Sequence, residues 1–260
     1  MAYRRLRIAG RRLAVASTSQ TAHGCARIDQ VTGIGSVGRP RHTAPLREGA
    51  SGRDQILDAA AQMFSEQGYS AASTRRIAEA VGVKQASLYY HFASKQDILA
   101  ELLAGTVRPS LAFSARLARS DEPPHIQLYA LTAFDVALLC SRRWNVGALY
   151  TLPELRAEQF ADFRRDRLML KRAYGRRVTA GLRDGVFSAT NAGVATALVF
   201  ALAESVIAMR ADGVHTGTRL GDVIATGCLR LLDCDATDLK TAAVESARLL
   251  ASGKPVERQF

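Results

Sequence analysis

The feature that most constrains the fold lies between Arg53 and Leu103, where apolar residues recur with a helical period and glycines interrupt the pattern. The first stripe recurs at i, i+1, i+4, i+7 and i+8 and is formed by Ile56, Leu57, Ala60, Met63 and Phe64. This spacing places the five side chains on one face of a helix. Gly68 follows as a natural stop, because glycine readily adopts the conformations that end helices.

A second short helix is predicted to begin after Ser73, whose side chain can cap the first free backbone N–H groups. Its inner face carries Ile77, Ala78 and Val81, and Gly82 ends it. Two short helices around a glycine-containing turn are typical of a helix-turn-helix, so a third helix is expected directly after this turn.

The third helix is predicted to begin near Lys84 or Gln85 and to turn Leu88 inward, with Phe92 covering the same side one turn later. Ser94 and Asp97 form the carboxylate version of a capping box for a fourth helix. The apolar stripe of that fourth helix consists of Ile98, Leu99, Leu102 and Leu103.

The second helix of a helix-turn-helix presents its N-terminal residues to base edges in the major groove of DNA. Here the positions between the inward residues are occupied by Lys84, Gln85, Ser87, Tyr89, Tyr90 and His91. These side chains supply donors, acceptors and aromatic edges on an exposed face. A purely structural protein gains little from exposing two tyrosines and a histidine together, so the pattern favours DNA binding. Arg75 and Arg76 alone indicate only a solvated face.

The stretch from Ser73 to Leu99 resembles the signature of the tetracycline-repressor (TetR) family, and so does Ile56 to Tyr69 with its Ala-Ala-x-x-Met-Phe-x-x-x-Gly-Tyr pattern. Several spaced elements agree over about 45 residues, which makes the resemblance specific. It implies an all-α homodimer with one helix-turn-helix in each subunit.

Carried over by position, the resemblance implies particular contacts with DNA. It places Tyr89 and His91 at the DNA backbone, and Lys95 and Thr74 at phosphates. It places Gln85 and Lys84 where family members approach bases, and leaves Tyr90 open to either role. Many members have serine at the position of Lys84, so a helix cap is lost here and the lysine is free to contact DNA.

The rest of the chain is also expected to be helical, with breaks at Pro109 and at Pro123-Pro124. A long charged helix is predicted from Pro153 to Leu182, with Arg164, Arg165, Lys171 and Arg172 on its outer side. We divide the chain into an arm (1–50), a DNA-binding head (51–98), an effector-binding and dimerisation body (99–235) and a C-terminal tail (236–260).

The resemblance implies that the last two long helices, near 190–210 and 218–233, form the dimer interface and that the middle helices enclose a ligand pocket. Small residues on the first of these helices, among them Gly193, Ala197 and Ala201, allow close helix packing. The candidate pocket residues are Tyr129, Phe134, Trp144, Tyr150 and Phe163. Plain core packing is the alternative for these five side chains.

The N-terminal segment holds much of the positive charge. The formal net charge is +11, and residues 1–52 contain nine arginines against Asp29 and Glu48. No hydrophobic face repeats there, so we predict a disordered arm. Two interpretations stay open: a segment that arises from a misassigned start codon, and a basic arm that adds non-specific phosphate contacts.

Other function classes lack support in the sequence. Four cysteines without a Cys-x-x-Cys pair are typical of reduced, cytosolic thiols, and no phosphate-binding loop, nucleophile elbow or metal-spaced cluster is present. The longest apolar stretch, 192–203, is shorter than the ~20 residues of a membrane span. We therefore expect a cytoplasmic regulator without cofactor or metal. It should be a homodimeric repressor of a palindromic double-stranded operator, released by a small molecule.

Two alternatives remain at this level. A protein that coats DNA with little sequence preference would need no body of this size. The choice between repressor and activator stays open from the residues, although the resemblance favours a repressor.

Overall fold

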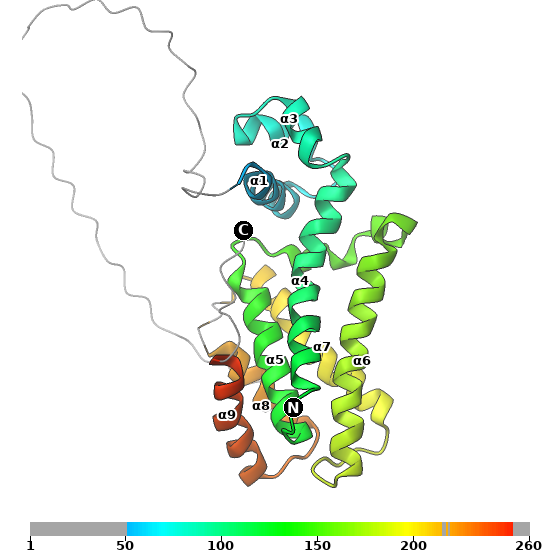
Figure 1. The fold of residues 1–260 in the computed structure, drawn as a ribbon, viewed down its shortest axis with the longest axis vertical. Coiled ribbons are helices and arrows are strands. Elements are labelled where there is room, and N and C mark those ends of the chain that lie inside the picture. The colour runs from blue at the N-terminus through cyan, green and yellow to red at the C-terminus, as the bar shows by residue number, and fades with distance from the viewer. Residues whose placement is uncertain (1–50, 215–216, 218, 252–260) are drawn as a thin grey trace, which may run out of the picture. The chain divides into compact units, whose positions relative to one another are not determined.

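The computed structural model describes residues 51–214, 217 and 219–251, and every regular element within these ranges is a helix (Figure 1). The head consists of α1 (Gly52–Gln67), α2 (Thr74–Val81) and α3 (Gln85–His91), and α4 (Lys95–Leu117) leads from it into the body. The body adds α5 (Pro124–Ser141), α6 (Ala161–Arg183), α7 (Ala192–Ala211), α8 (Leu220–Leu231) and α9 (Ala236–Ala251). The predicted all-α fold, with a three-helix head and a helical body, is confirmed. The predicted arm at residues 1–50 lies outside the described residues.

The helix ends in the head follow from short polar side chains. The Ser73 hydroxyl accepts a hydrogen bond from Arg76 N at 3.3 Å at the start of α2. Ser94 Oγ accepts from Asp97 N at 3.1 Å and donates to Asp97 Oδ2 at 2.8 Å at the start of α4. Gly82 ends α2 in the left-handed conformation, with φ +78°, which strains any residue that carries a Cβ. These local signals were all visible in the sequence.

The prediction of a break at Pro109 was wrong, because α4 continues through this residue from 95 to 117. A proline inside a helix has no N–H for the carbonyl four residues earlier, which here belongs to Gly105. Arg142 supplies the missing donor, with its Nη2 at 2.7 Å from Gly105 O. A Cβ at position 105 would lie 2.6 Å from that nitrogen, so glycine is needed for the close approach. The same helix crosses our boundary at 98/99, so head and body share α4.

The long charged helix begins later than predicted, at Ala161 instead of Pro153. Residues 146–160 form three short 3₁₀ helices: η1 (Val146–Thr151), η2 (Pro153–Arg156) and η3 (Glu158–Phe160). The residues between them, Leu152 and Ala157, are extended, with ψ 129° and 153°. Proline disfavours helical geometry in the residue before it, which explains the extended Leu152. The segment thus folds across the body and does not form the first turns of α6.

Residues 236–251, which we assigned to a C-terminal tail, form helix α9 instead. Asp235 Oδ1 accepts hydrogen bonds from Thr237 N and Asp238 N, at 2.7 and 2.8 Å, and so caps the helix. α9 packs against α5 and α8, where Ala242 and Ser246 are buried one turn apart. Small residues at this spacing were not recognised as a buried face because they carry little hydrophobic signal.

A buried carboxylate lies at the centre of the body. Asp135 of α5 is 2% exposed and accepts hydrogen bonds from Ser110 Oγ of α4 at 2.7 Å and Tyr174 OH of α6 at 3.1 Å. It therefore joins three helices. Burial raises the pKa of Asp135 from 3.8 to about 6, and the two hydrogen bonds oppose part of this rise.

We expect Asp135 to make the stability of the body depend on pH. Because its pKa is higher in the folded state, its contribution is fully present below pH 3.8 and is lost as the pH rises through about 6. The rise in pKa from 3.8 to about 6 is a change of roughly 100-fold in proton affinity, and each factor of ten corresponds to ~1.4 kcal/mol. The free energy of unfolding should therefore fall by about 3 kcal/mol across this pH range. Urea unfolding at several pH values should show this slope in the natural protein and a flatter one in Asp135→Asn. The exposed Asp121→Asn is the control, and an unchanged slope in Asp135→Asn would contradict the assignment.

Two helices are long and apolar enough to cross a membrane by length and composition alone, namely α4 and α7. Our estimate of the apolar stretch as residues 192–203 was therefore too short, because the apolar helix α7 continues to Ala211. Within the body, Glu204 forms an ion pair with Arg167 of α6, with Arg167 Nε at 2.9 Å from Glu204 Oε1. Only 28% of the apolar window of α7 is buried, so one face of this helix lacks a partner within the described chain.

Candidate DNA-binding surface

The helix-turn-helix presents α3 on a small apolar base. Leu88 and Ile77 are completely buried, and Phe92 is 4% exposed. The guanidinium of Arg53 lies over the Phe92 ring at 4.7 Å and forms an ion pair with Glu101 of α4 at 2.9 Å. α3 is therefore held from beneath by apolar packing, and its opposite face is left to solvent.

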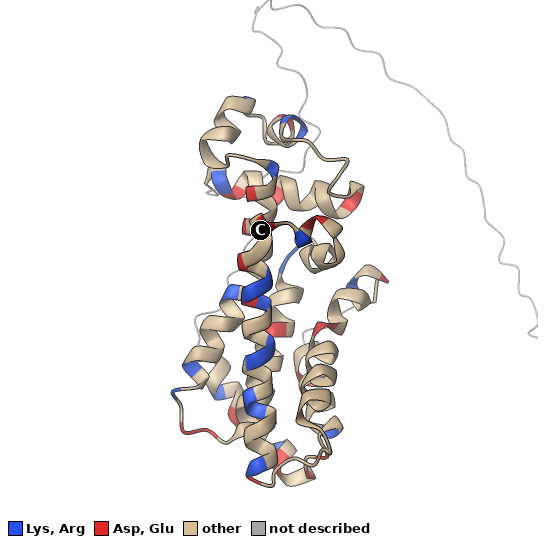
Figure 2. Cartoon of the chain, turned by 90° about the vertical axis from the view of Figure 1, so that its right-hand side faces the viewer, with Lys and Arg blue, Asp and Glu red and all other residues tan. Residues whose placement is uncertain are grey.

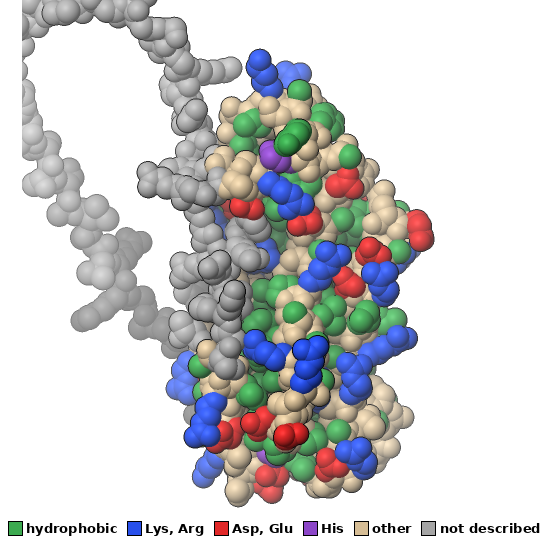
Figure 3. All heavy atoms as spheres, in the orientation of Figure 1, with side chains coloured by type: hydrophobic (Ala, Val, Ile, Leu, Met, Phe, Trp, Pro, Cys, Tyr) green, Lys and Arg blue, Asp and Glu red, His purple; other side chains and the backbone are tan. Residues whose placement is uncertain are grey.

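The exposed face of α3 carries the side chains that the sequence predicted for DNA. Tyr89 and Tyr90 are 47% and 86% exposed, and Lys84, Gln85, Ser87 and His91 are also exposed. The rings of Tyr90 and His91 meet edge to face at 5.2 Å. Figure 3 shows basic, hydrophobic and histidine side chains gathered at this end of the molecule. These groups match the donors and aromatic edges that a DNA groove and its phosphates accept.

Three of the predicted residues form one hydrogen-bonded group. Gln85 Nε2 donates to Thr74 Oγ1 at 3.2 Å, and Thr74 Oγ1 lies 3.1 Å from Tyr89 OH. The group joins the first residue of α2 to successive turns of α3. Among the described residues, the second amide proton of Gln85 and its carbonyl oxygen have no partner, and these are the two groups that an adenine edge requires.

Lys84 occupies the N-cap position of α3, and among the described residues its side chain forms no capping hydrogen bond. This agrees with the loss of a cap expected from the sequence. The ammonium group is therefore available at the exposed start of α3.

Lys95 points inward in this structure. Its Nζ donates to Tyr69 O and Ala72 O, both at 2.9 Å, and lies 4.2 Å from the centre of the Tyr69 ring. Burial lowers the pKa of Lys95, and the nearby Glu154 carboxylate opposes this effect. The ammonium thus positions the loop between α1 and α2, and its expected phosphate contact stays a prediction.

The head is electrostatically balanced. Residues 51–98 contain five basic and five acidic side chains, so attraction to DNA must come from where individual charges lie. The described basic residues are more frequent on α6, where Lys and Arg follow one another along the helix in Figure 2. Two of these arginines, Arg164 and Arg167, line a pocket in the body.

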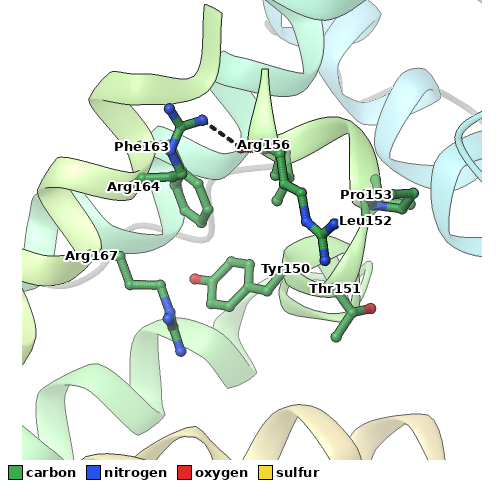
Figure 4. A pocket seen from close by; sticks show the side chains of 9 residues that line it. Tyr150, Thr151, Leu152, Pro153, Arg156, Phe163, Arg164 and Arg167 are labelled. Carbon is green, nitrogen blue, oxygen red and sulfur yellow. Dashed lines mark hydrogen bonds between the residues drawn. The ribbon is translucent and has the colours of Figure 1, made fainter. Parts of the chain in front are cut away.

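The pocket lies between η1–η2 and the first turns of α6 and has a volume of about 460 Å³ (Figure 4). It is lined by Tyr150, Thr151, Leu152, Pro153, Leu155, Arg156, Phe163, Arg164 and Arg167. Two of the five residues expected to line a pocket, Tyr150 and Phe163, are among them. The three arginines were not predicted, because an arginine-rich helix start was interpreted as a solvated outer face.

The other three expected residues lie elsewhere. Tyr129 is 2% exposed, and its hydroxyl donates to Asp222 Oδ1 at 3.3 Å. Phe134 stacks on Phe113 with ring centroids 4.3 Å apart. Trp144 donates from Nε1 to Asp58 Oδ1 of α1 at 3.1 Å, so it joins the body to the head.

Comparisons with known proteins agree with these features. Residues 56–102 match the family of bacterial regulatory proteins described as the tetR family. In the head, the chain is 47% identical over 55 residues to the HTH-type transcriptional repressor KstR2 of Mycobacterium tuberculosis, covering 21% of this chain and 28% of KstR2. It is 50% identical over 46 residues to the biofilm operon negative transcriptional regulator IcaR of Staphylococcus aureus, covering 18% of this chain and 25% of IcaR. The match thus spans about a quarter of these curated relatives.

A solved structure extends the likeness to the body. The crystal structure of Mycobacterium smegmatis AmtR superposes with a TM-score of 0.72 at 43% identity, covering 79% of this chain and 98% of AmtR. Proteins of this kind are DNA-binding transcriptional regulators and not enzymes. Because nearly all of AmtR is matched at this identity, the chain belongs to the tetR family of bacterial regulatory proteins.

Proposed function

We propose that this DNA-binding regulator is a homodimeric repressor that reads a palindromic operator through α3 and is released from it by a small molecule in the cytoplasm. The observation that carries the proposal is the exposed polar face of α3, held in place by the buried Leu88 and joined to α2 through Thr74. KstR2 is a transcriptional repressor and IcaR a negative transcriptional regulator, which favours repression over activation. Selection of bound sequences from a random DNA pool tests the proposal directly.

Sequence preference separates this proposal from a protein that coats DNA. A specific regulator binds its site typically 10³–10⁷ times more tightly than random DNA. A selected consensus with two inverted half-sites supports the operator, and a pool that stays random after selection supports the coating protein.

Gln85→Ala should relax base preference at one position of each half-site. A bidentate contact to a base discriminates by roughly 1–3 kcal/mol, so affinity for the operator should fall by about 5–150-fold and affinity for random DNA should change little. Fluorescence anisotropy on both DNAs measures the difference. Gln159→Ala, an exposed glutamine of η3, is the control. Equal losses on operator and random DNA would exclude base reading by Gln85.

The dimer is proposed to form through the open faces of α7 and α8. Val194 and Leu198 of α7 are 56% and 50% exposed, and Val223 and Leu231 of α8 are 63% and 41% exposed. The two helices pack closely within the chain, since a Cβ at Gly227 would lie 3.3 Å from Leu202 Cδ2. Exposed apolar side chains on two packed helices favour an interface, and a two-fold axis through it gives two heads for two half-sites.

Ala201→Glu should separate the subunits without unfolding them. Ala201 is exposed on the same helix, so a glutamate there is solvated in the monomer but buried without a partner in the proposed dimer. Leaving a charge buried and unpaired costs ~3–5 kcal/mol, which raises the dimer dissociation constant at least about 100-fold. Sedimentation equilibrium measures this constant. Ala115→Glu on the exposed side of α4 is the control. A dissociation constant that Ala201→Glu leaves unchanged would place the interface elsewhere.

A further inference from the structure

The pocket beside α6 combines positive charge with apolar walls. Arg156, Arg164 and Arg167 line it together with Tyr150 and Phe163, and the nine lining residues include no acidic side chain. Figure 4 shows the Tyr150 ring between the side chains of Arg156 and Arg167. Such a lining suits a ligand with both an anionic group and an apolar group.

The three arginines differ in how far their charge is compensated. Arg167 forms an ion pair with Glu204 and lies 5.6 Å from the centre of the Tyr150 ring. Arg164 donates to the carbonyl oxygens of Leu155 and Ala157, at 2.6 and 2.7 Å, which orients its guanidinium without neutralising it. Arg156 has no ion-pair or hydrogen-bond partner among the described residues. The pocket therefore holds about two uncompensated positive charges.

The wall of the pocket also contacts the head at both of its ends. The segment from Trp144 to Arg156 begins with the hydrogen bond from Trp144 Nε1 to Asp58 Oδ1 of α1. Near its other end, Glu154 Oε1 accepts a hydrogen bond from Ser70 Oγ, in the loop between α1 and α2, at 3.2 Å. Glu154 belongs to η2, a helix of four residues that also contains Arg156.

The junction at Glu154 has room to rearrange. Tyr69 OH and Glu154 Oε2 are both buried, and neither has a hydrogen-bond partner among the described residues. Buried polar atoms without partners are costly, so a shift of η2 that supplied partners for them would gain free energy. A shift of η2 would change the contacts that hold the loop before α2.

We propose that this pocket binds a small organic anion, a carboxylate or a phosphate ester attached to an apolar group, and that residues 144–156 transmit its binding to the head. The anion binds the guanidinium of Arg156, which has no partner among the described residues, and its apolar part packs on Tyr150 and Phe163. The proposal rests on the proposed release by a small molecule and gives that molecule an anionic group.

The binding step is tested on the full chain without DNA. Benzoate and phenyl phosphate serve as anionic probes, and benzamide is the neutral probe of similar shape. Calorimetry measures binding, and the fluorescence of Trp144, the one tryptophan, follows the segment itself. We expect both anions to bind at least about 10-fold more tightly than benzamide. The tighter of the two anions identifies the carboxylate or the phosphate ester as the preferred group.

Arg156→Gln should weaken the anion that binds by about 10-fold or more, because a charge-assisted hydrogen bond is lost and no other described contact of this exposed side chain is disturbed. Arg172→Gln, on the exposed side of α6 outside the pocket, should leave binding unchanged. Failure of both anions to bind up to about 10 mM, where affinity is negligible, overturns the site. An equal loss of anion affinity in Arg156→Gln and Arg172→Gln also overturns the site, because it indicates general attraction of anions to a basic protein.

Transmission is tested by adding operator DNA to the same titrations. Linkage requires the operator to weaken the anion by the factor by which the anion weakens DNA binding. Ser70→Ala, which removes the donor to Glu154 Oε1 and lies outside the pocket lining, should keep anion binding and lose most of this mutual effect. Anion binding that operator does not change overturns the transmission. A protein that binds no operator refutes the proposed function instead, and the titrations without DNA still decide the site.

Discussion

Leu88→Asp should unfold the head and abolish DNA binding while the body stays helical. Leu88 is the completely buried residue of α3 and belongs to the same hydrophobic cluster as Ile77 and Phe92 of the head. A carboxylate at this place lies in a hydrophobic environment, and leaving a charge buried and unpaired costs ~3–5 kcal/mol. A core built from three short helices has little stability with which to absorb such a loss. Operator affinity should therefore fall by more than about 100-fold.

The matched control for Leu88→Asp is Tyr90→Asp, which introduces the same charge two residues later at a position that is 86% exposed. This second variant should keep the head folded, because its carboxylate stays in water, although repulsion from phosphates weakens DNA binding. Amide hydrogen exchange in α1–α3 distinguishes the two cases. Protection of α3 that is as strong in Leu88→Asp as in Tyr90→Asp would contradict the role of Leu88.

Arg142→Met should destabilise the body by about 3–5 kcal/mol, which combines the loss of a buried side chain with an unsatisfied carbonyl. The Arg142 side chain reaches Gly105 O because Pro109 has no N–H to offer. Burial lowers the pKa of Arg142, so the guanidinium already bears a desolvation cost that its contacts offset. Urea unfolding at a fixed protein concentration measures the change.

Pro109→Ala gives this prediction a selective test, because alanine restores the N–H that Gly105 O lacks. The double variant Arg142→Met, Pro109→Ala should therefore be more stable than the sum of the single changes implies, by about 1 kcal/mol. Ala115→Gly, at an exposed site on the same helix, provides a pair that should be additive with Arg142→Met. Additive effects in both pairs would show that Arg142 does not replace the donor that proline removes.

The head could be predicted almost completely from the sequence. The apolar stripe of α1, the cap at Ser73, the left-handed Gly82 and the inward Leu88 all depend on interactions between residues a few positions apart. Side-chain period, capping and turn geometry are short-range effects, so the order of residues determines them directly. The exposed positions on α3 could also be predicted, because they are the positions left over once the buried ones have been assigned.

In the body, the tertiary structure decided what local patterns could not. Pro109 lies within a continuous helix because Arg142, 33 positions later, satisfies the free carbonyl of Gly105. Lys95 turns inward because the loop before α2 offers it two carbonyls.

The same holds for α9 and for the pocket. α9 is a packed helix because α5 and α8 cover its small residues. Arg156 and Arg164 share a pocket because 3₁₀ turns bring η2 back against α6. From the sequence alone, we predicted a break at Pro109, a phosphate contact for Lys95, a tail after residue 235 and a solvated face on the arginine-rich helix. Which partner satisfies a carbonyl or lies beside a charge depends on contacts between distant residues, and only the folded chain determines those contacts.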